Sequence, residues 1–148
     1  MTREPAYPLT VFYDASCPLC AMEMHALQEH DRLGRLKLVD CSARDFDDAP
    51  LVGDGLRRAD LMARMHARDS RGHWYVALDA FEVIYRAAGL ERAARLWGSL
   101  ALRPLFDRIY PWIARNRQAL SRLGMHILVR LALSAALANR PPGSCPRP

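Results

Sequence analysis

The sequence is short of cysteine, and its few cysteines are unevenly spaced. Four occur in 148 residues, and only Cys17 and Cys20 lie close together. Zinc sites need four ligands, commonly from two closely spaced pairs, and the distant Cys41 and Cys145 do not supply a second pair. The spacing therefore favours a redox-active dithiol at Cys17 and Cys20, with a metal site and an inert pair as the alternatives.

Lysine is almost absent, since Lys37 is the only one, although the net charge is +5. The positive charge comes from arginines, which are spread along the chain instead of being clustered. A surface that binds nucleic acid gathers basic residues on one face or along one helix. We expect no nucleic-acid partner.

The first residues, which read MTREP, contain no apolar run of the kind a secretory signal requires. A cytoplasmic location is therefore expected, where thiols are kept reduced and a CxxC pair is more often catalytic or sensing than structural. A transmembrane span is not expected either, because Arg130 interrupts the apolar segment at 118–138.

The close cysteine pair stands where a strand is expected to turn into a helix. A β-branched and aromatic run at 9–13 predicts a strand, and a helix should begin near Cys17 and end at about His30. At an exposed helix N-terminus, free N–H groups and the helix dipole stabilise a thiolate, so the pKa of Cys17 should be lowered. Cys20 shares a helix face with Met24 and Leu27 and should point inward as the resolving thiol.

The rest of the first ninety residues alternates between strand and helix patterns, separated by turn residues. The expected elements are a strand at 36–39, a loop at 41–55, a helix at 56–62, antiparallel strands at about 63–68 and 73–76, and a helix at 78–88. The segment at 63–68 also has helix propensity, but the turn after it favours a hairpin. The order β-α-β-α-β-β-α is that of a thioredoxin-like α/β domain.

The last third of the sequence favours helices. One should open at Pro104, kink at Pro111 and run to Arg117, and a second should begin at Gln118. We expect residues 1–90 to form the core, residues 91–138 a helical extension packed on the same domain, and residues 139–148 a flexible Pro- and Gly-rich tail. The alternative is that the apolar helix at 118–138 docks to a membrane surface or to a partner subunit, such as a second copy in a homodimer.

Asp14, Cys17 and Cys20 follow the pattern D-x-x-C-x-x-C, and further short motifs follow it in order along the chain. These are Val39-Asp40, Asp45-Phe46-Asp47, Met65-His66, Asp79-Ala80-Phe81, Arg103-Pro104-Leu105-Phe106-Asp107 and Ala114-Arg115-Asn116-Arg117. In type, order and spacing they resemble the thiol-disulfide oxidoreductase family called DCC, over about residues 8–120. The resemblance implies a thioredoxin-like fold and thiol–disulfide exchange activity.

Two features depart from what the resemblance implies. The family commonly has glycine after the aspartate, whereas this chain has Ala15, so the turn must form without a residue that tolerates positive φ. Thioredoxins carry a cis-proline just before the third strand, whereas no proline occurs here between Gly53 and Arg103. Because that proline shapes the substrate groove, its absence argues against a general protein-reductase activity.

Four further side chains are candidates for the site. Asp14 either relays the thiol proton or serves as a turn residue that caps free N–H groups. His66 falls where the cis-proline loop of a thioredoxin would lie, so it either faces Cys17 as a proton partner or is a buried, hydrogen-bonded histidine. Cys41 is either a third redox partner or a small buried hydrophobe, and Cys145 is expected to be an exposed thiol of the tail.

These observations predict a thiol–disulfide oxidoreductase that needs no cofactor beyond a thiol reductant. Cys17 would attack a disulfide of a protein or small molecule, and Cys20 would resolve the mixed disulfide. Glutathione-linked exchange is one alternative, because proline directly after the first cysteine resembles glutaredoxins. The other is a non-enzymatic interaction module of the same fold that docks through its C-terminal helices.

Overall fold

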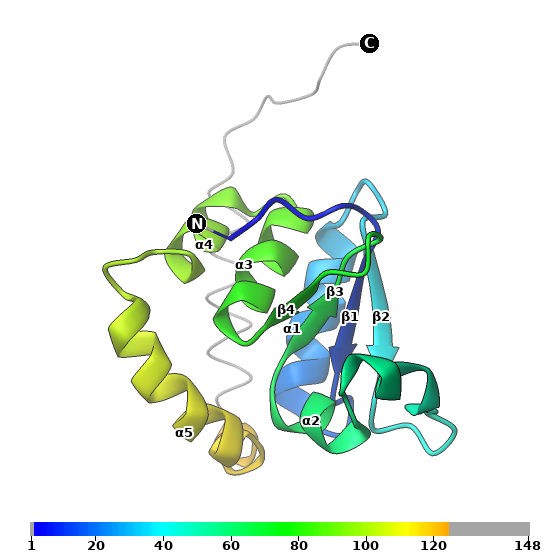
Figure 1. Cartoon of the computed structure of the whole chain (residues 1–148). Coiled ribbons are helices and arrows are strands. Elements are labelled where there is room, and N and C mark those ends of the chain that lie inside the picture. The colour runs from blue at the N-terminus through cyan, green and yellow to red at the C-terminus, as the bar shows by residue number, and fades with distance from the viewer. Residues whose placement is uncertain (1, 125–148) are drawn as a thin grey trace.

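The computed structural model describes residues 2–124, and these form a mixed α/β domain (Figure 1). The elements in order are β1 (Leu9–Tyr13), α1 (Pro18–His30), β2 (Leu36–Asp40), the 3-10 helix η1 (Ala49–Asp54), α2 (Arg58–Ala63), β3 (His66–Arg68), β4 (Trp74–Val76), α3 (Leu78–Ala87), α4 (Glu91–Trp97) and α5 (Arg103–Arg122). The order through α3 confirms the thioredoxin-like β-α-β-α-β-β-α prediction.

The four strands form one sheet in the order β2-β1-β3-β4. β1 and β2 are parallel, with Val11 opposite Leu38, and α1 forms the crossover between them. β3 is antiparallel to β1, with Phe12 opposite His66, and β4 is antiparallel to β3. Both hairpin strands are short, and the turn between them uses Gly72 with a φ of 84°.

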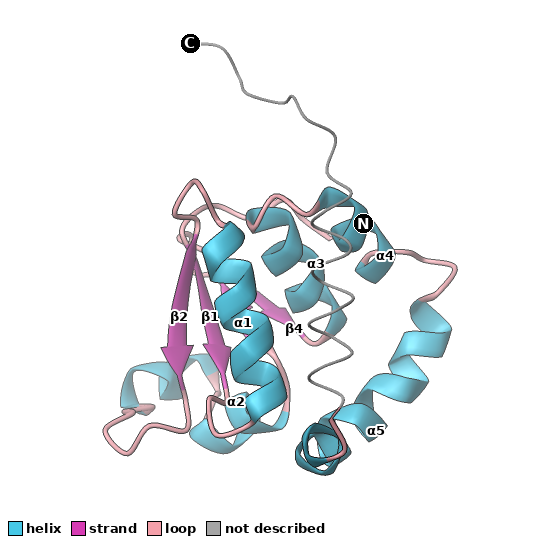
Figure 2. Ribbon diagram, turned by 180° about the vertical axis from the view of Figure 1, so that it is seen from behind, coloured by secondary structure: helices cyan, strands magenta, loops and turns pink. Residues whose placement is uncertain are grey.

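The alternation of side chains along β1 builds two apolar clusters, one on each face of the sheet. Leu9, Val11 and Tyr13 belong to a larger cluster that includes residues of α1 and α3, such as Met24 and Ile84. Phe12 lies in a smaller cluster with residues of η1 and α2. α1 lies behind the sheet and α2 in front of it in Figure 1, and Figure 2 shows α1 from its own side.

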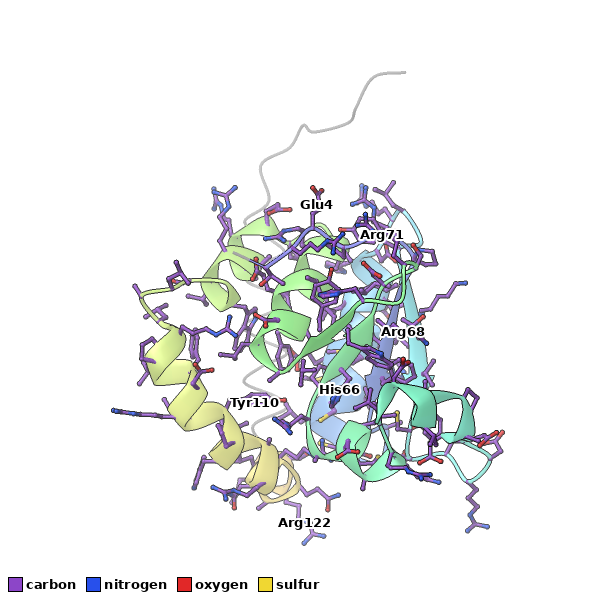
Figure 3. The ribbon with its side chains drawn as sticks, in the orientation of Figure 1. Glu4, His66, Arg68, Arg71, Tyr110 and Arg122 are labelled. Atoms are coloured by element: carbon purple, nitrogen blue, oxygen red, sulfur yellow. The ribbon has the colours of Figure 1, made fainter. Side chains whose placement is uncertain are left out.

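The helices after α3 contact the larger cluster through aromatic side chains. The ring of Trp97 in α4 stacks on Phe81 with centroids 5.0 Å apart, and it also meets Phe106 of α5 at 5.3 Å. Tyr110 lies further along α5, and its hydroxyl oxygen accepts a hydrogen bond of 3.0 Å from the backbone N–H of Met65. α5 is thereby held at the start of β3, and Figure 3 shows Tyr110 between the two elements.

Several boundaries differ from the sequence predictions. β3 begins at His66, and Ala63 still belongs to α2. The predicted strand at 63–68 therefore starts too early. The predicted loop at 41–55 contains η1. α5 continues past Arg117, where one helix was expected to end and a second to begin, and Pro111 lies inside it.

The C-terminal predictions lie mostly outside the described residues. α5 ends at Arg122, just before Gly124, whose φ of 82° suits a helix stop. The remainder of the predicted helix at 118–138, the tail at 139–148 and Cys145 lie beyond residue 124. Within residues 2–124, no helix is both long enough and apolar enough to cross a bilayer. The division between core and extension at residue 90 stays a prediction.

Candidate active site

The cysteine pair occupies the junction between β1 and α1. Cys17 has an extended conformation at the N-cap, and its carbonyl oxygen accepts the first helical hydrogen bond, from Ala21 at 2.9 Å. Pro18 follows at the first helical position, where a backbone N–H would have no partner. Contrary to the expected exposure, Cys17 is 0% exposed and Cys20 is partly exposed.

The two thiols nevertheless differ in acidity in the predicted direction. A hydrogen bond donated by the Cys20 thiol lowers the pKa of Cys17 to about 6, helped by backbone N–H groups of the first helical turn and by the charge of Arg117. The same hydrogen bond, together with burial, raises the pKa of Cys20. The pair therefore holds a thiolate at Cys17 and a protonated thiol at Cys20.

Asp14 is buried directly before this junction, and both of its carboxylate oxygens are bonded. Oδ1 accepts hydrogen bonds from the backbone N–H of Ser16 at 3.0 Å and from its hydroxyl at 2.5 Å. Oδ2 accepts a hydrogen bond of 2.7 Å from Nη2 of Arg117. Asp14 therefore stabilises the turn through Ser16 and forms an ion pair with Arg117.

Arg117 connects α5 to the cysteine loop across 103 residues of sequence. Besides Asp14, its Nη2 group also bonds the backbone carbonyl of Met62 at the end of α2. The Arg117 side chain is 19% exposed and that of Asp14 is 1% exposed, so water screens the pair weakly. The same guanidinium favours the thiolate of Cys17.

Glu23 lies three residues after Cys20, so the two side chains lie on neighbouring positions of α1. Its Oε1 atom accepts a hydrogen bond of 2.7 Å from the hydroxyl of Tyr85 in α3. Burial raises the pKa of the Glu23 carboxyl, and the nearby negative charge of Cys17 raises it further. A carboxyl of this kind accepts a proton more readily than an exposed glutamate.

Of the two readings of His66, its described contacts favour the buried, hydrogen-bonded histidine over a proton partner that faces Cys17. Its register opposite Phe12 places its side chain on the face of the smaller cluster, whereas α1 covers the other face. The ring lies edge-on to Trp74 at 6.3 Å, and Nδ1 bonds the carbonyl oxygen of Arg64 at 2.9 Å. Burial lowers the pKa of His66, so the buried, hydrogen-bonded reading describes it.

Cys41 and Ala15 complete the surroundings of the loop. Cys41 follows β2 and is 0% exposed, and burial raises its pKa to about 12, so it is held as a neutral thiol. Ala15 donates its backbone N–H to Oδ1 of Asp40 at 3.1 Å. Within residues 2–124 the one non-glycine residue with positive φ is Ala77, so the turn forms without straining Ala15.

No group of three or more histidine, cysteine or acidic side chains among residues 2–124 is arranged to hold a metal ion. The two further residues at the dithiol, Arg117 and Glu23, were not identified as site residues from the sequence. Arg117 stood in one of the short motifs of the resemblance, and Glu23 stood one helical turn after Cys20. Both positions could therefore have been noticed in the sequence, but the contacts of Arg117 with Asp14 and of Glu23 with Tyr85 could not be predicted without the tertiary structure.

The comparison with protein families matches residues 11–123 to the DCC1-like thiol-disulfide oxidoreductase family. The chain belongs to this family. The matched range includes the cysteine pair, the sheet except for the first two residues of β1, and all of α5, so the dithiol and Arg117 both lie within the family's domain.

A curated relative is an uncharacterized chloroplastic protein of Arabidopsis thaliana, 33% identical over 112 residues. The match covers 75% of this chain and 51% of the relative, so the chain spans about half the length of that protein. No solved structure matches the chain. Family membership supports a thiol-disulfide function and leaves the reaction and its substrate to chemical argument.

Proposed function

We propose that the protein catalyses thiol–disulfide exchange with Cys17 as the nucleophile and Cys20 as the resolving thiol. The observation that carries this assignment is the position of Cys17 at the N-cap of α1, where the neighbouring Cys20 thiol and the first-turn N–H groups lower the pKa of Cys17 while the pKa of Cys20 is raised. A thiolate is the reactive form of cysteine, so the sulfur that ionises first also attacks first. Family membership supports the reaction class.

The reaction divides into two displacements. The Cys17 thiolate attacks one sulfur of a substrate disulfide, so that a Cys17–substrate disulfide forms and the other substrate sulfur leaves as a thiolate. Cys20 then loses its proton and attacks the Cys17 sulfur, which releases the second substrate thiolate and leaves a Cys17–Cys20 disulfide. A thiol reductant restores the dithiol, and the same steps in reverse oxidise a substrate dithiol.

Glu23 is the group that we assign to accept the proton of Cys20 in the second displacement. It lies one helical turn from Cys20, and its raised pKa brings it closer to that of a thiol than an ordinary carboxyl. The Tyr85 hydroxyl holds the carboxylate in place. His66 has no part in this scheme, and the contacts of Asp14 favour a structural duty.

The direct test is the pH profile of Cys17 alkylation in the reduced protein. Because the pKa of Cys17 is about 6, the rate should be half-maximal near pH 6, whereas an ordinary cysteine reaches that point at about pH 8.5. Labelling is followed by mass spectrometry of peptides, so that each cysteine is read separately. A half-maximal rate near pH 8.5 for Cys17 would contradict the assignment.

Glu23→Gln tests the proton acceptor, because glutamine keeps the size of the side chain and an oxygen for Tyr85 but does not take a proton. We expect the first displacement to keep its rate and the second to slow by roughly tenfold to a hundredfold, so that mixed disulfide accumulates. Rapid quenching with acid and mass spectrometry measure both steps. Glu29→Gln, in the exposed last turn of α1, is the matched control, and equal behaviour of the two variants would rule out the role of Glu23.

A non-enzymatic docking function is the second candidate, and one feature of α5 favours it. Leu105, Ile109 and Trp112 are between 41% and 53% exposed on one side of this helix. Arg108 and Arg115 flank that side and form no ion pair with any described residue. An apolar face edged by arginines is typical of helices that lie on anionic membranes.

The docking function predicts that the full chain binds vesicles containing anionic lipid, with a blue shift of tryptophan fluorescence that Trp112→Ala reduces. Vesicles of neutral lipid serve as the control, because they have the same apolar interior but no negative surface charge. Binding to neither kind of vesicle, with self-association in its place, would favour docking to a second copy of the chain in a homodimer. A cytoplasmic location remains part of the proposal.

A further inference from the structure

A cavity of about 310 Å³ lies between the cysteine loop and the C-terminal end of α5. Its described lining residues are Ser16, Pro18, Gln118, Ser121 and Arg122. Ser16 and Pro18 are the two neighbours of Cys17 in the chain, so a molecule in the cavity lies against the loop that carries the nucleophile, although Cys17 itself is not among the described lining residues. The proposed function does not yet use this space.

The size of the cavity and the burial of Cys17 point to a small substrate. Sites for small molecules span about 300 to 1,000 Å³, and this cavity stands at the lower end of that range. Cys17 is 0% exposed, so no disulfide reaches its sulfur in this arrangement, and the groups that cover it have to move before the reaction. A disulfide of a few heavy atoms needs much less room to approach it.

The charged groups that line the cavity favour a negatively charged substrate. Its described residues include one cation, Arg122, and no carboxylate. Arg117 one turn earlier is already paired with Asp14, whereas Arg122 is exposed and forms no ion pair with a described residue. A guanidinium without a partner, beside hydroxyl and amide groups, is suited to bind a carboxylate.

We propose that this cavity binds a carboxylate-bearing, low-molecular-weight disulfide, with Arg122 pairing with the carboxylate and the disulfide held beside the cysteine loop until the sulfur of Cys17 is uncovered. The inference rests on the proposed exchange function and names its substrate class. The Cys17 thiolate forms a mixed disulfide with one half of the substrate and expels the other half as a thiolate. Attack by Cys20 then releases the bound half, so one disulfide becomes two thiols as the protein dithiol is oxidised.

The experiment compares three small disulfides of similar length on the full, reduced chain. They are the disulfides of 3-mercaptopropionic acid, 2-mercaptoethanol and cysteamine, which are anionic, neutral and cationic. Each rate constant for oxidation of the protein is divided by the rate constant of the same disulfide with dithiothreitol, which removes intrinsic reactivity. We expect the anionic disulfide to exceed the neutral one by roughly tenfold, the effect of one charge-assisted hydrogen bond, and the cationic one to be the slowest.

Arg122→Gln should bring the anionic-to-neutral ratio close to one, and Arg122→Lys should restore part of it. Arg92→Gln removes the same charge from an exposed position of α4 outside the cavity, and it should leave the ratio unchanged. A ratio that is the same in wild type and Arg122→Gln would overturn the inference while exchange itself stands. Failure of the wild type to react with any of the three disulfides would overturn the proposed function as well.

Discussion

Cys17→Ser is expected to reduce thiol–disulfide exchange to the uncatalysed rate. A serine hydroxyl does not ionise near neutral pH, and its oxygen forms no mixed disulfide. Cys20→Ser should retain the first displacement and lose the second, so the protein should accumulate as a covalent complex with half of its substrate. Turnover of a small disulfide and the intact mass of the protein measure the two effects separately.

Cys41→Ser is the control for these variants. Cys41 is as deeply buried as Cys17, but its pKa is raised to about 12 instead of lowered, so it should contribute no thiolate and its replacement should leave turnover nearly unchanged. Substantial exchange by Cys17→Ser would show that another thiol is the nucleophile. Absence of a trapped complex in Cys20→Ser would show that Cys20 is not the resolving thiol.

Arg117→Met is expected to have the largest effect on stability. It removes the charge while keeping most of the length of the side chain, and it leaves the Asp14 carboxylate, 1% exposed, without its counter-ion. Breaking a buried ion pair in this way costs about 3–5 kcal/mol. Since the Arg117 charge also lowers the pKa of Cys17, the midpoint of the alkylation profile should move to higher pH. Chemical denaturation and the alkylation profile measure the two results.

Arg115→Met supplies the comparison on the same helix, because Arg115 is exposed and pairs with no described residue. It should change the free energy of unfolding by less than about 0.5 kcal/mol. The double variant Asp14→Asn with Arg117→Met should cost less than the sum of the two single variants, because neither charge is then left unpaired. Equal stability and equal Cys17 titration in Arg115→Met and Arg117→Met would exclude a role for the ion pair.

Elements with strong local signals were predicted closely. β1 and α1 lie within the ranges expected from the apolar run at 9–13, the turn before Cys17 and the proline at the first helical position. The start of β3 was predicted less well, since Ala63 has the propensity of a helix and the strand holds only three residues. The continuation of α5 past Arg117 depends on packing that a local pattern does not contain.

The candidate active site likewise has some features that local sequence predicts and others that depend on tertiary packing. The dithiol, its position at a helix N-terminus and the order of the two acidities follow from residues 9–20, because helix capping and the first-turn N–H groups are local interactions. The burial of Cys17 was not predicted, since a position in a helix does not reveal which other elements cover it. The choice between the two readings of His66 could not be made from the sequence, because the face on which its side chain lies depends on the register of β3 against β1.

The sequence by itself determined the fold class, the family and the place of the cysteine pair at the start of a helix, because each depends on neighbouring residues and their order. Only the tertiary structure decided the groups that surround that dithiol: Arg117 from 103 residues away, the Tyr85 hydroxyl on Glu23, and Arg122 beside the cavity. The physical reason is that the sequence gives the charge of each side chain, whereas the effect of that charge on the pKa of another group depends on the distance between them and on burial. Those two quantities are set when α3 and α5 pack against the sheet and α1.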